Sequence, residues 1–187
     1  MNLVVKKTTL PACYELLPEV RGDERGVFIK TFHKTIFEKY HLETNFAEEY
    51  YSVSHKGVLR GMHFQTPPHD HTKIVYCVCG EVMDVLVDLR VGSPTYGDFE
   101  VFSLSAKDSN MLYIPPGLAH GFYVTSDQAI LMYKVATVYQ HQHDTGILWS
   151  SIGIPWINEH PFISERDSNF KCFRDFISPF RYEVKNE

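Results

Sequence analysis

Between residues 73 and 136 the chain repeats one pattern, in which short runs of β-branched, aliphatic and aromatic residues alternate with turn-forming Gly, Pro, Asn, Asp and Ser. Evenly spaced short strands of this kind are typical of an antiparallel sandwich or jelly roll. The predicted strands are Lys73 to Cys79, Val82 to Leu89, Phe99 to Leu104, Asn110 to Ile114, Gly121 to Val124 and Ala129 to Ala136. The fold class is therefore expected to be all-β.

The second of these runs shows which side chains face inward. Alternate residues of a strand point to opposite faces, so Met83, Val85, Val87 and Leu89 share one face, and Val82, Asp84, Leu86 and Asp88 share the other. Asp84 is therefore expected to face an interior and to act there as a hydrogen-bonding support. Gly80-Glu81, just before this run, predicts a hairpin.

Two further segments are expected to be helical. Thr35 to Leu42 has the apolar spacing of a short helix. Five aromatic residues near the end, spaced two to four apart, predict a helical C-terminal segment packed on the barrel or on a second subunit. They are Phe170, Phe173, Phe176, Phe180 and Tyr182. No linker or low-complexity run interrupts the chain, so residues 1–187 are expected to form a single domain.

Charge and hydropathy exclude two classes of partner. The formal net charge is -5, and the 18 Lys and Arg residues are scattered, which argues against a nucleic-acid-binding surface. No run approaches the ~18 apolar residues of a membrane span, and the N-terminus lacks a signal-peptide pattern. We therefore expect no membrane partner and a cytoplasmic location.

Two segments predict an enzyme: Gly57-Val-Leu-Arg-Gly-Met-His-Phe64 and Pro115-Pro-Gly-Leu-Ala-His-Gly-Phe122. Each places a histidine beside glycines and apolar residues. Histidine is the side chain best suited to move a proton near neutral pH, and an arginine offers a fork for a phosphate or carboxylate. Arg60 is therefore expected to anchor a substrate on which His63 acts.

Several motifs resemble one family in their order and spacing. They are Asp23-Glu-Arg-Gly-Val-Phe28, Ser52-Val-Ser-His-Lys-Gly-Val-Leu-Arg-Gly-Met-His-Phe-Gln65, Asp84-Val-Leu-Val-Asp-Leu-Arg90, Gly92-Ser-Pro-Thr-Tyr-Gly97, Tyr113-Ile-Pro-Pro-Gly-Leu-Ala-His-Gly-Phe122 and Tyr133-Lys134. Together they resemble the dTDP-4-dehydrorhamnose 3,5-epimerases. The resemblance implies a cupin-like jelly-roll barrel, a homodimer, no metal or other cofactor, and a nucleoside-diphosphate 4-keto-6-deoxyhexose as substrate.

The resemblance also implies catalytic roles. Inversion of a carbon next to a ketone needs a base, a group that stabilises the enolate, and an acid on the opposite face. By resemblance His63 is the base and Asp167 orients its ring. Tyr133 is the acid, and Lys73 stabilises the enolate. Three of these residues also have structural interpretations, namely core packing for Tyr133, a strand-edge charge for Lys73 and a helix cap for Asp167.

Substrate binding is implied for three more residues. Arg25 and Arg60 would clamp the diphosphate, where the bidentate geometry of arginine is favoured, and His120 would line the pocket. Arg25 lies near a glycine turn, where it can equally be an ordinary surface residue.

The chain departs from the family where the nucleotide base is expected to bind. The usual Gln-x-Asn before two serines is Glu48-Glu-Tyr50 here, and Lys30 replaces an acidic residue. A carboxylate accepts a hydrogen bond from an exocyclic amine, and a lysine only donates. These two changes favour cytosine, or another amino-bearing base, over thymine, so the nucleotide is left open among dTDP, CDP and GDP.

Two competing functions remain. His69-x-His71 and His120 resemble the ligands of metal-dependent cupin isomerases and dioxygenases, but Val75 and Tyr76 occupy the expected place of a glutamate ligand, and the His69 loop is expected to be solvated. A non-catalytic sugar-nucleotide binding module would be expected to keep Arg25 and Arg60 but to lose His63, Tyr133 or Asp167. All three of these are present. The sequence leaves open the sugar and whether C3, C5 or both are inverted.

Overall fold

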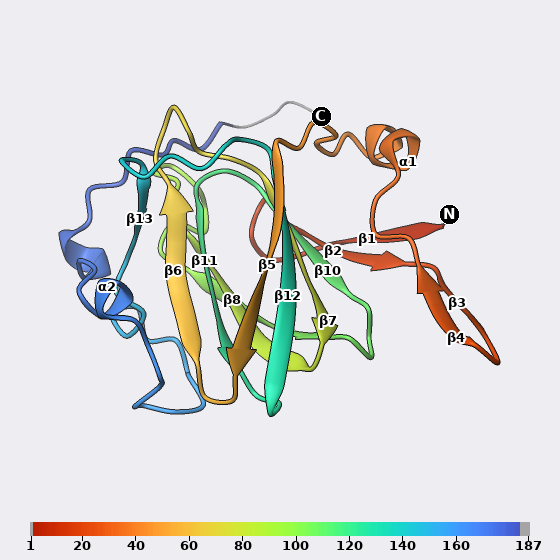
Figure 1. The fold of residues 1–187 in the computed structure, drawn as a ribbon. Coiled ribbons are helices and arrows are strands. Elements are labelled where there is room, and N and C mark those ends of the chain that lie inside the picture. The colour runs from red at the N-terminus through yellow and green to blue at the C-terminus, as the bar shows by residue number, and fades with distance from the viewer. Residues whose placement is uncertain (1, 184–187) are drawn as a thin grey trace.

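Two antiparallel sheets form the body of the protein, in a computed structural model that describes residues 2–183. The six-stranded sheet has the order β1 (Leu3–Lys7), β2 (Tyr14–Pro18), β10 (Met111–Ile114), β7 (Lys73–Cys79), β12 (Gln128–Val135) and β5 (Glu48–His55). The five-stranded sheet has the order β13 (Asp144–Gly146), β6 (Leu59–Gln65), β11 (Leu118–Val124), β8 (Glu81–Asp88) and β9 (Phe99–Ser105). Figure 1 shows the two sheets curving around a shared interior, which confirms the jelly-roll barrel.

All six predicted strands form. Their ends lie within one residue of the predicted ends, except that β11 begins at Leu118 instead of Gly121. The predicted hairpin turns at Gly80, where φ is +77° and an added Cβ would lie 2.0 Å from the carbonyl oxygen of Gln128. Only glycine fits there. Strands β1 to β6 and β13 were not predicted, and β5 shows why, because most of its residues are exposed or half-buried and no alternation is visible in its sequence.

The core has three layers: one on each face of the five-stranded sheet, and a third on the outer face of the six-stranded sheet, where Phe37 packs with Ile74 and Met111. Val82 and Leu86 lie between the sheets, together with Leu131 from the opposite wall. Met83, Val85, Val87 and Leu89 pack instead into a second cluster outside the barrel, with Phe180 and partly buried tryptophans. The predicted alternation is confirmed, and Asp84 is fully buried.

The N-terminal helix forms and the C-terminal one does not. Helix α1 (Lys34–Lys39) lies within one residue of the predicted start and buries Phe37. The aromatic tail has only one turn of α-helix, α2 (Glu165–Ser168), before it and a 3₁₀ turn, η1 (Phe173–Asp175), within it. The predicted helical character of the C-terminal segment is therefore limited to these two turns, and its predicted packing on the barrel is confirmed. No helix within residues 2–183 is long and apolar enough to cross a membrane.

The aromatic tail runs along the outer face of the five-stranded sheet instead. Phe176 and Phe180 each pack against Phe64 of β6, and isolated bridges join the tail to Ile147 and Val91. Since one helical turn advances only about 5 Å, a nearly extended chain covers much more of the sheet's apolar face. Tertiary contacts therefore override the local spacing.

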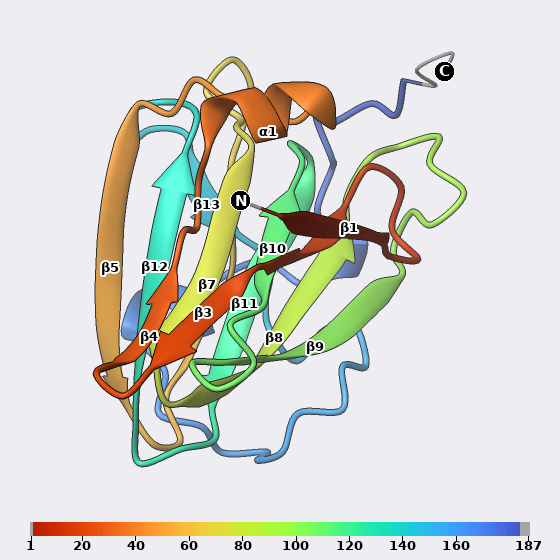
Figure 2. The same ribbon diagram turned by 90° about the vertical axis from the view of Figure 1, so that its right-hand side faces the viewer.

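A two-stranded hairpin, β3 (Val20–Asp23) and β4 (Gly26–Ile29), projects from the six-stranded sheet. In Figure 2 it lies in front of β7 and β12, well away from the five-stranded sheet. Its residues are nearly all exposed, including Val27 at 70% and Phe28 at 63%.

Candidate active site

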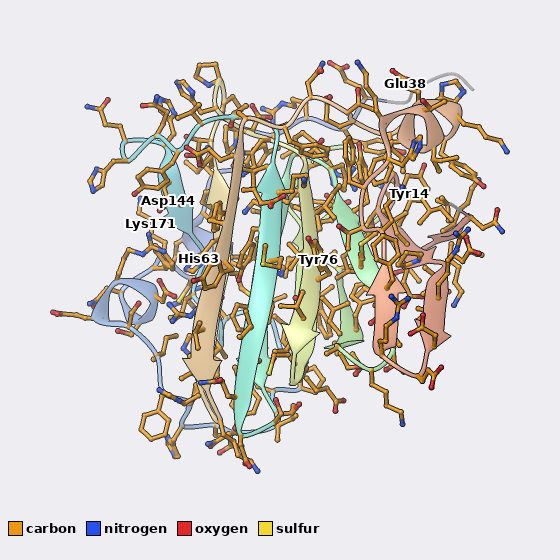
Figure 3. All side chains as sticks on the ribbon, turned by 45° about the vertical axis from the view of Figure 1, so that its right-hand side comes forward. Tyr14, Glu38, His63, Tyr76, Asp144 and Lys171 are labelled. Atoms are coloured by element: carbon orange, nitrogen blue, oxygen red, sulfur yellow. The ribbon has the colours of Figure 1, made fainter. Side chains whose placement is uncertain are left out.

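A cavity of about 430 Å³ opens between the two sheets. Seven of the residues predicted for the site line it, namely Glu48, Tyr50, Arg60, His63, Lys73, His120 and Tyr133. Eight others complete its wall: Ser52, Gln65, His71, Phe122, Val135, Tyr139, Asp144 and Arg166. Figure 3 shows His63 and Asp144 on the same side of the barrel, far from Tyr14 and Glu38.

Strand register explains why these residues meet. His63 of β6 pairs directly with His120 of β11, so both rings belong to the five-stranded sheet. On the opposite wall, Lys73 of β7 pairs with Val135 of β12, and Tyr133 lies two residues from that pair. Residues two apart in a strand share a face, so His63 and Tyr133 approach the cavity from opposite sheets.

The His63 imidazole has a buried carboxylate partner. Its Nε2 lies 2.9 Å from Oδ2 of Asp167, whose side chain is 4% exposed. Asp167 also accepts a hydrogen bond from the backbone nitrogen of Gly61 at 3.2 Å. Burial alone would raise the pKa of Asp167, but the hydrogen bonds from these neighbours lower it to about 2. Asp167 is therefore ionised at neutral pH and can stabilise a protonated His63.

Two details of the chain allow this pairing. Gly61 has φ +145°, and an added Cβ would lie 2.5 Å from Cα of Gly121, so only glycine permits β6 to approach β11 here. Ser164 caps α2 by accepting from the backbone nitrogen of Asp167. The interpretation of Asp167 as a helix cap is therefore wrong, because Ser164 takes that place and frees the Asp167 carboxylate.

Arg166 enters the site although the residue analysis gave it no role. Its guanidinium lies 2.6 Å from Asp144, 3.1 Å from Asp167 and 2.9 Å from Nε2 of His63. A guanidinium only donates hydrogen bonds, so the contact of Arg166 with His63 requires that Nε2 carries no proton. The contact of the Asp167 carboxylate with the same Nε2 requires instead that Nε2 carries a proton. Burial and Arg166 lower the pKa of His63, and Asp167 opposes them, with a net lowering. The ring is therefore neutral and able to accept a proton near pH 7.

Lys73 is buried at the beginning of β7, between β10 and β12, and is 9% exposed. The interpretation as a strand-edge charge is therefore wrong. Burial lowers its pKa to about 8, and Asp144 opposes that shift. The side chain is still mostly a cation near pH 7, in a buried position where a cation acts strongly on a developing negative charge.

Tyr133 combines core packing with a polar end in the cavity. The residue is 8% exposed, its ring stacks on Tyr50 at 4.9 Å, and its hydroxyl lies 3.3 Å from that of Ser52. Burial raises the pKa of Tyr133 above its usual range. It therefore keeps its proton at neutral pH and is available as an acid.

A second histidine of the cavity, His120, also has a carboxylate partner. Its Nε2 lies 2.7 Å from Oδ2 of Asp84, and both side chains are almost fully buried. Burial raises the pKa of Asp84, although His120 acts in the opposite direction. Asp84 does not line the cavity, so its contact with the site runs through His120.

Two predicted binding residues lie outside the cavity of their own chain. Arg25 sits at the tip of the β3–β4 hairpin, pairs with Asp23 at 2.5 Å and has a side chain that is 88% exposed. Lys30 lies beside Phe28 in a shallow surface depression. The structure brings neither to Arg60, whose Nε donates to Ser54 at 2.9 Å, because the hairpin points away from the barrel interior.

The paired histidines of the loop before β7 separate. His69 packs its ring against His143 at 4.6 Å, whereas His71 lines the cavity and is half-buried. The expectation that both are solvated is therefore wrong for His71. Over residues 2–183, no three His, Cys, Asp or Glu side chains are grouped so that they could hold a metal ion.

Comparison with known proteins assigns this arrangement to a family. The sequence model of the dTDP-4-dehydrorhamnose 3,5-epimerases matches residues 7–175. The chain belongs to the dTDP-4-dehydrorhamnose 3,5-epimerase family. A Shigella flexneri dTDP-4-dehydrorhamnose 3,5-epimerase is 43% identical over 94% of this chain and 97% of its own length. The chain therefore has the isomerase character of a sugar-nucleotide epimerase, as the motifs indicated.

Solved structures of the family agree in fold. A Legionella pneumophila 3,5-epimerase crystallised with dTDP-4-keto-L-rhamnose superposes with a TM-score of 0.93, at 32% identity, over 98% of this chain and all of the other. A Streptomyces bikiniensis 3'-monoepimerase in complex with dTDP-quinovose gives a TM-score of 0.84 at 28% identity, covering 89% of this chain and 86% of its own. Family members thus include enzymes described as inverting both carbons or one.

Proposed function

We propose that the protein epimerises a nucleoside-diphosphate 4-keto-6-deoxyhexose at C3, C5 or both, in deoxysugar biosynthesis, through a single domain and without a cofactor. The observation that carries this proposal is the cavity in which His63 with its buried carboxylate faces Tyr133 from the opposite sheet, beside the buried cation Lys73. This set contains each group that inversion next to a ketone requires.

The proposed reaction is a proton removal followed by a proton return. The His63 imidazole takes the proton from the carbon next to the C4 ketone, and the electrons of the broken C–H bond form an enolate. The Lys73 ammonium stabilises the negative charge on the C4 oxygen, while Asp167 stabilises the imidazolium. The Tyr133 hydroxyl then delivers a proton to the opposite face of the same carbon. Exchange with solvent restores both residues.

Deuterium incorporation tests this function. The protein is incubated in D₂O with dTDP-, CDP- and GDP-linked 4-keto-6-deoxyhexoses, and NMR locates the deuterium. We expect incorporation at each inverted carbon. His63→Ala should abolish it, and Tyr133→Phe should permit exchange but impair inversion. Binding of the nucleotide sugar without any exchange would overturn the proposal in favour of a non-catalytic binding module. A normal inversion rate in Tyr133→Phe would leave Tyr133 as a packing residue.

We also propose a homodimer in which the β3–β4 hairpin of one protomer supplies Arg25 to the diphosphate held by Arg60 of the other. Two observations support it. The hairpin exposes Val27 and Phe28, and β5, an edge strand of the six-stranded sheet whose other face lines the cavity, exposes Tyr51 at 64%, so both elements carry apolar surface suited to a second copy. Arg25 is also too far from the cavity of its own chain to serve there.

Mixing two variants tests this arrangement. His63→Ala removes the base and Arg25→Ala removes the hairpin cation, so each purified variant should have low activity. After subunit exchange, a mixed dimer has one site with both native residues, and activity should exceed the sum of the two variants. No gain, in a mixture that sedimentation shows to contain exchanged dimers, would contradict a site shared between subunits.

The nucleotide is proposed to be dTDP, which the names of the relatives support. The prediction of CDP now depends on Glu48, which lines the cavity and accepts from the backbone nitrogen of Tyr139 at 3.1 Å, because Lys30 lies outside the cavity of its own chain. Calorimetry with dTDP, CDP and GDP on the wild type and on Glu48→Gln decides between them. Tighter binding of CDP, reduced by Glu48→Gln, would establish the amino-bearing base.

A further inference from the structure

His71 has a position in the cavity that none of the roles above uses. His71 is half-buried and lines the same cavity as Lys73, which follows it by two residues in the chain. The same cavity wall includes Gln65 and Tyr139. An imidazole is therefore available to whatever binds beside the Lys73 ammonium.

One edge of the His71 ring is held by the wall. Its Nδ1 lies 2.7 Å from Oγ1 of Thr137 and 3.2 Å from Nε2 of Gln65. Both partners are themselves fixed. Gln65 accepts from the backbone nitrogen of Gln140 at 2.6 Å, and both Gln65 and Thr137 donate to the carbonyl oxygen of His69, at 2.9 and 3.0 Å. This network sets the orientation of the ring before any ligand arrives.

The opposite edge of the ring is available. Within residues 2–183, Nε2 of His71 has no hydrogen-bond partner, and it is not among the buried polar atoms that lack one. It is therefore accessible from the cavity. Burial and the nearby Lys73 lower the pKa of His71 to about 3, so the ring is neutral at neutral pH.

A neutral imidazole forms one hydrogen bond at Nε2, as an acceptor when Nδ1 carries the ring proton and as a donor when Nε2 carries it. On the wall side, the Thr137 hydroxyl can accept from Nδ1 or donate to it, whereas the Gln65 amide nitrogen only donates. A sugar hydroxyl can both donate and accept, so beside a cation that attracts the ketone oxygen it fits Nε2 of His71 in either tautomer.

We propose that His71 positions the sugar, with its Nε2 hydrogen-bonded to the C2 or C3 hydroxyl of the hexose whose ketone lies at Lys73. The inference rests on the proposed function and adds a specificity-determining residue to it. It predicts that the site distinguishes sugars that have this hydroxyl from those that lack it.

Two isosteric variants separate this role from a purely structural one. His71→Asn keeps an amide near the position of Nδ1, on the Thr137 side, and removes the group at Nε2. His71→Gln places its amide near Nε2 and gives up the wall contact. We expect His71→Asn to raise KM roughly 5- to 150-fold, as expected when a buried partner is left unpaired, and His71→Gln to stay nearer the wild type. The opposite order would overturn the proposal. His69→Ala is the matched control, since it keeps the backbone carbonyl and its ring lies outside the cavity.

Substrates that lack one hydroxyl complete the test. With the 2-deoxy and 3-deoxy analogues, deuterium exchange at C5 is still measurable. An analogue without the contacted hydroxyl cannot make the bond to His71, so wild type and His71→Asn should have nearly the same KM for it. The analogue that removes the difference in KM identifies the carbon that bears the contacted hydroxyl. An unchanged difference with both analogues would overturn the hydroxyl contact. If the wild type shows no exchange with any nucleotide sugar, the proposed function fails, and calorimetric binding of the same sugars by the three proteins still decides the role of His71.

Discussion

Two histidines face each other across β6 and β11, each with an aspartate, yet the two pairs differ in access and charge. The His63 side chain is 25% exposed to the cavity, and its partner Asp167 also accepts from Gly61. The His120 side chain is 5% exposed, and Oδ1 of Asp84 has no hydrogen-bond partner among residues 2–183. The first pair is reachable and fully bonded, whereas in the second pair only His120 borders the cavity and Asp84 is enclosed.

The difference shows how one barrel can hold both a reactive pair and a supporting pair. Donors around Asp167 bring its pKa to about 2, so its negative charge persists and favours a proton on His63. Within residues 2–183 Asp84 is hydrogen-bonded only to His120, and burial raises its pKa. The number of hydrogen bonds to each carboxylate, more than the identity of the residues, separates the two pairs.

The largest expected effect distinguishes the histidines themselves. His63→Asn should reduce the rate of deuterium exchange about 10²- to 10⁴-fold, the range that a positioned base contributes. His120→Asn should reduce it about 2- to 10-fold, as for the loss of one neutral hydrogen bond. Single-turnover exchange measured by NMR compares them. Equal losses would mean that both histidines take part in proton transfer.

The aspartates should follow the same order with smaller effects. Asp167→Asn removes a charged partner, and a hydrogen bond to a charged group contributes about 1.5–3 kcal/mol, so kcat should fall roughly 10- to 150-fold. Asp84→Asn keeps an acceptor for His120 and should change kcat less than about tenfold. A greater loss in Asp84→Asn would place the essential charge in the second pair.

Stability should depend on pH differently in the two aspartate variants. The pKa of Asp167 is lowered, so it stabilises the fold by ~2 kcal/mol above pH 4, a contribution lost as pH falls toward 2. The pKa of Asp84 is raised, so its ionisation costs stability as pH rises above about 4. Urea unfolding between pH 3 and 8 measures the free energy of unfolding. Above pH 4 this free energy should be lower in Asp167→Asn than in the wild type by a constant amount. In Asp84→Asn it should change less with pH than in the wild type. Parallel profiles for the two variants would contradict this difference.

The smallest expected effect is none. If His71 and His120 were instead metal ligands, as in the metal-dependent alternative, the contrast between a reactive and a supporting pair would disappear. Dialysis against EDTA should leave the exchange rate unchanged, because His63, Lys73 and Tyr133 supply base, enolate stabiliser and acid. Loss of activity that returns on adding a divalent metal would instead support the metal-dependent alternative.

The sequence by itself determined the all-β class, six strands between residues 73 and 136, and the inward face of β8. These follow from alternation of apolar and polar residues, which is local and persists wherever one face is buried. The exposed strands β3 to β5 carry no such signal. Strands β3 and β4 pair with each other as a local hairpin, whereas β5 pairs with β12, which is distant in the chain. The aromatic tail carried a misleading signal, because its partner is the outer face of a sheet.

For the site, motifs identified the residues that line the cavity, and only the tertiary structure decided their environment. His71 was expected in solvent but lies at the cavity, and Arg166 meets His63 because α2 folds back on β6. Burial lowers the pKa of Lys73, and hydrogen bonds from His63 and Gly61, which lie more than a hundred residues away in the chain, help to lower that of Asp167. Charge and desolvation depend on three-dimensional neighbours, which no spacing along the chain specifies.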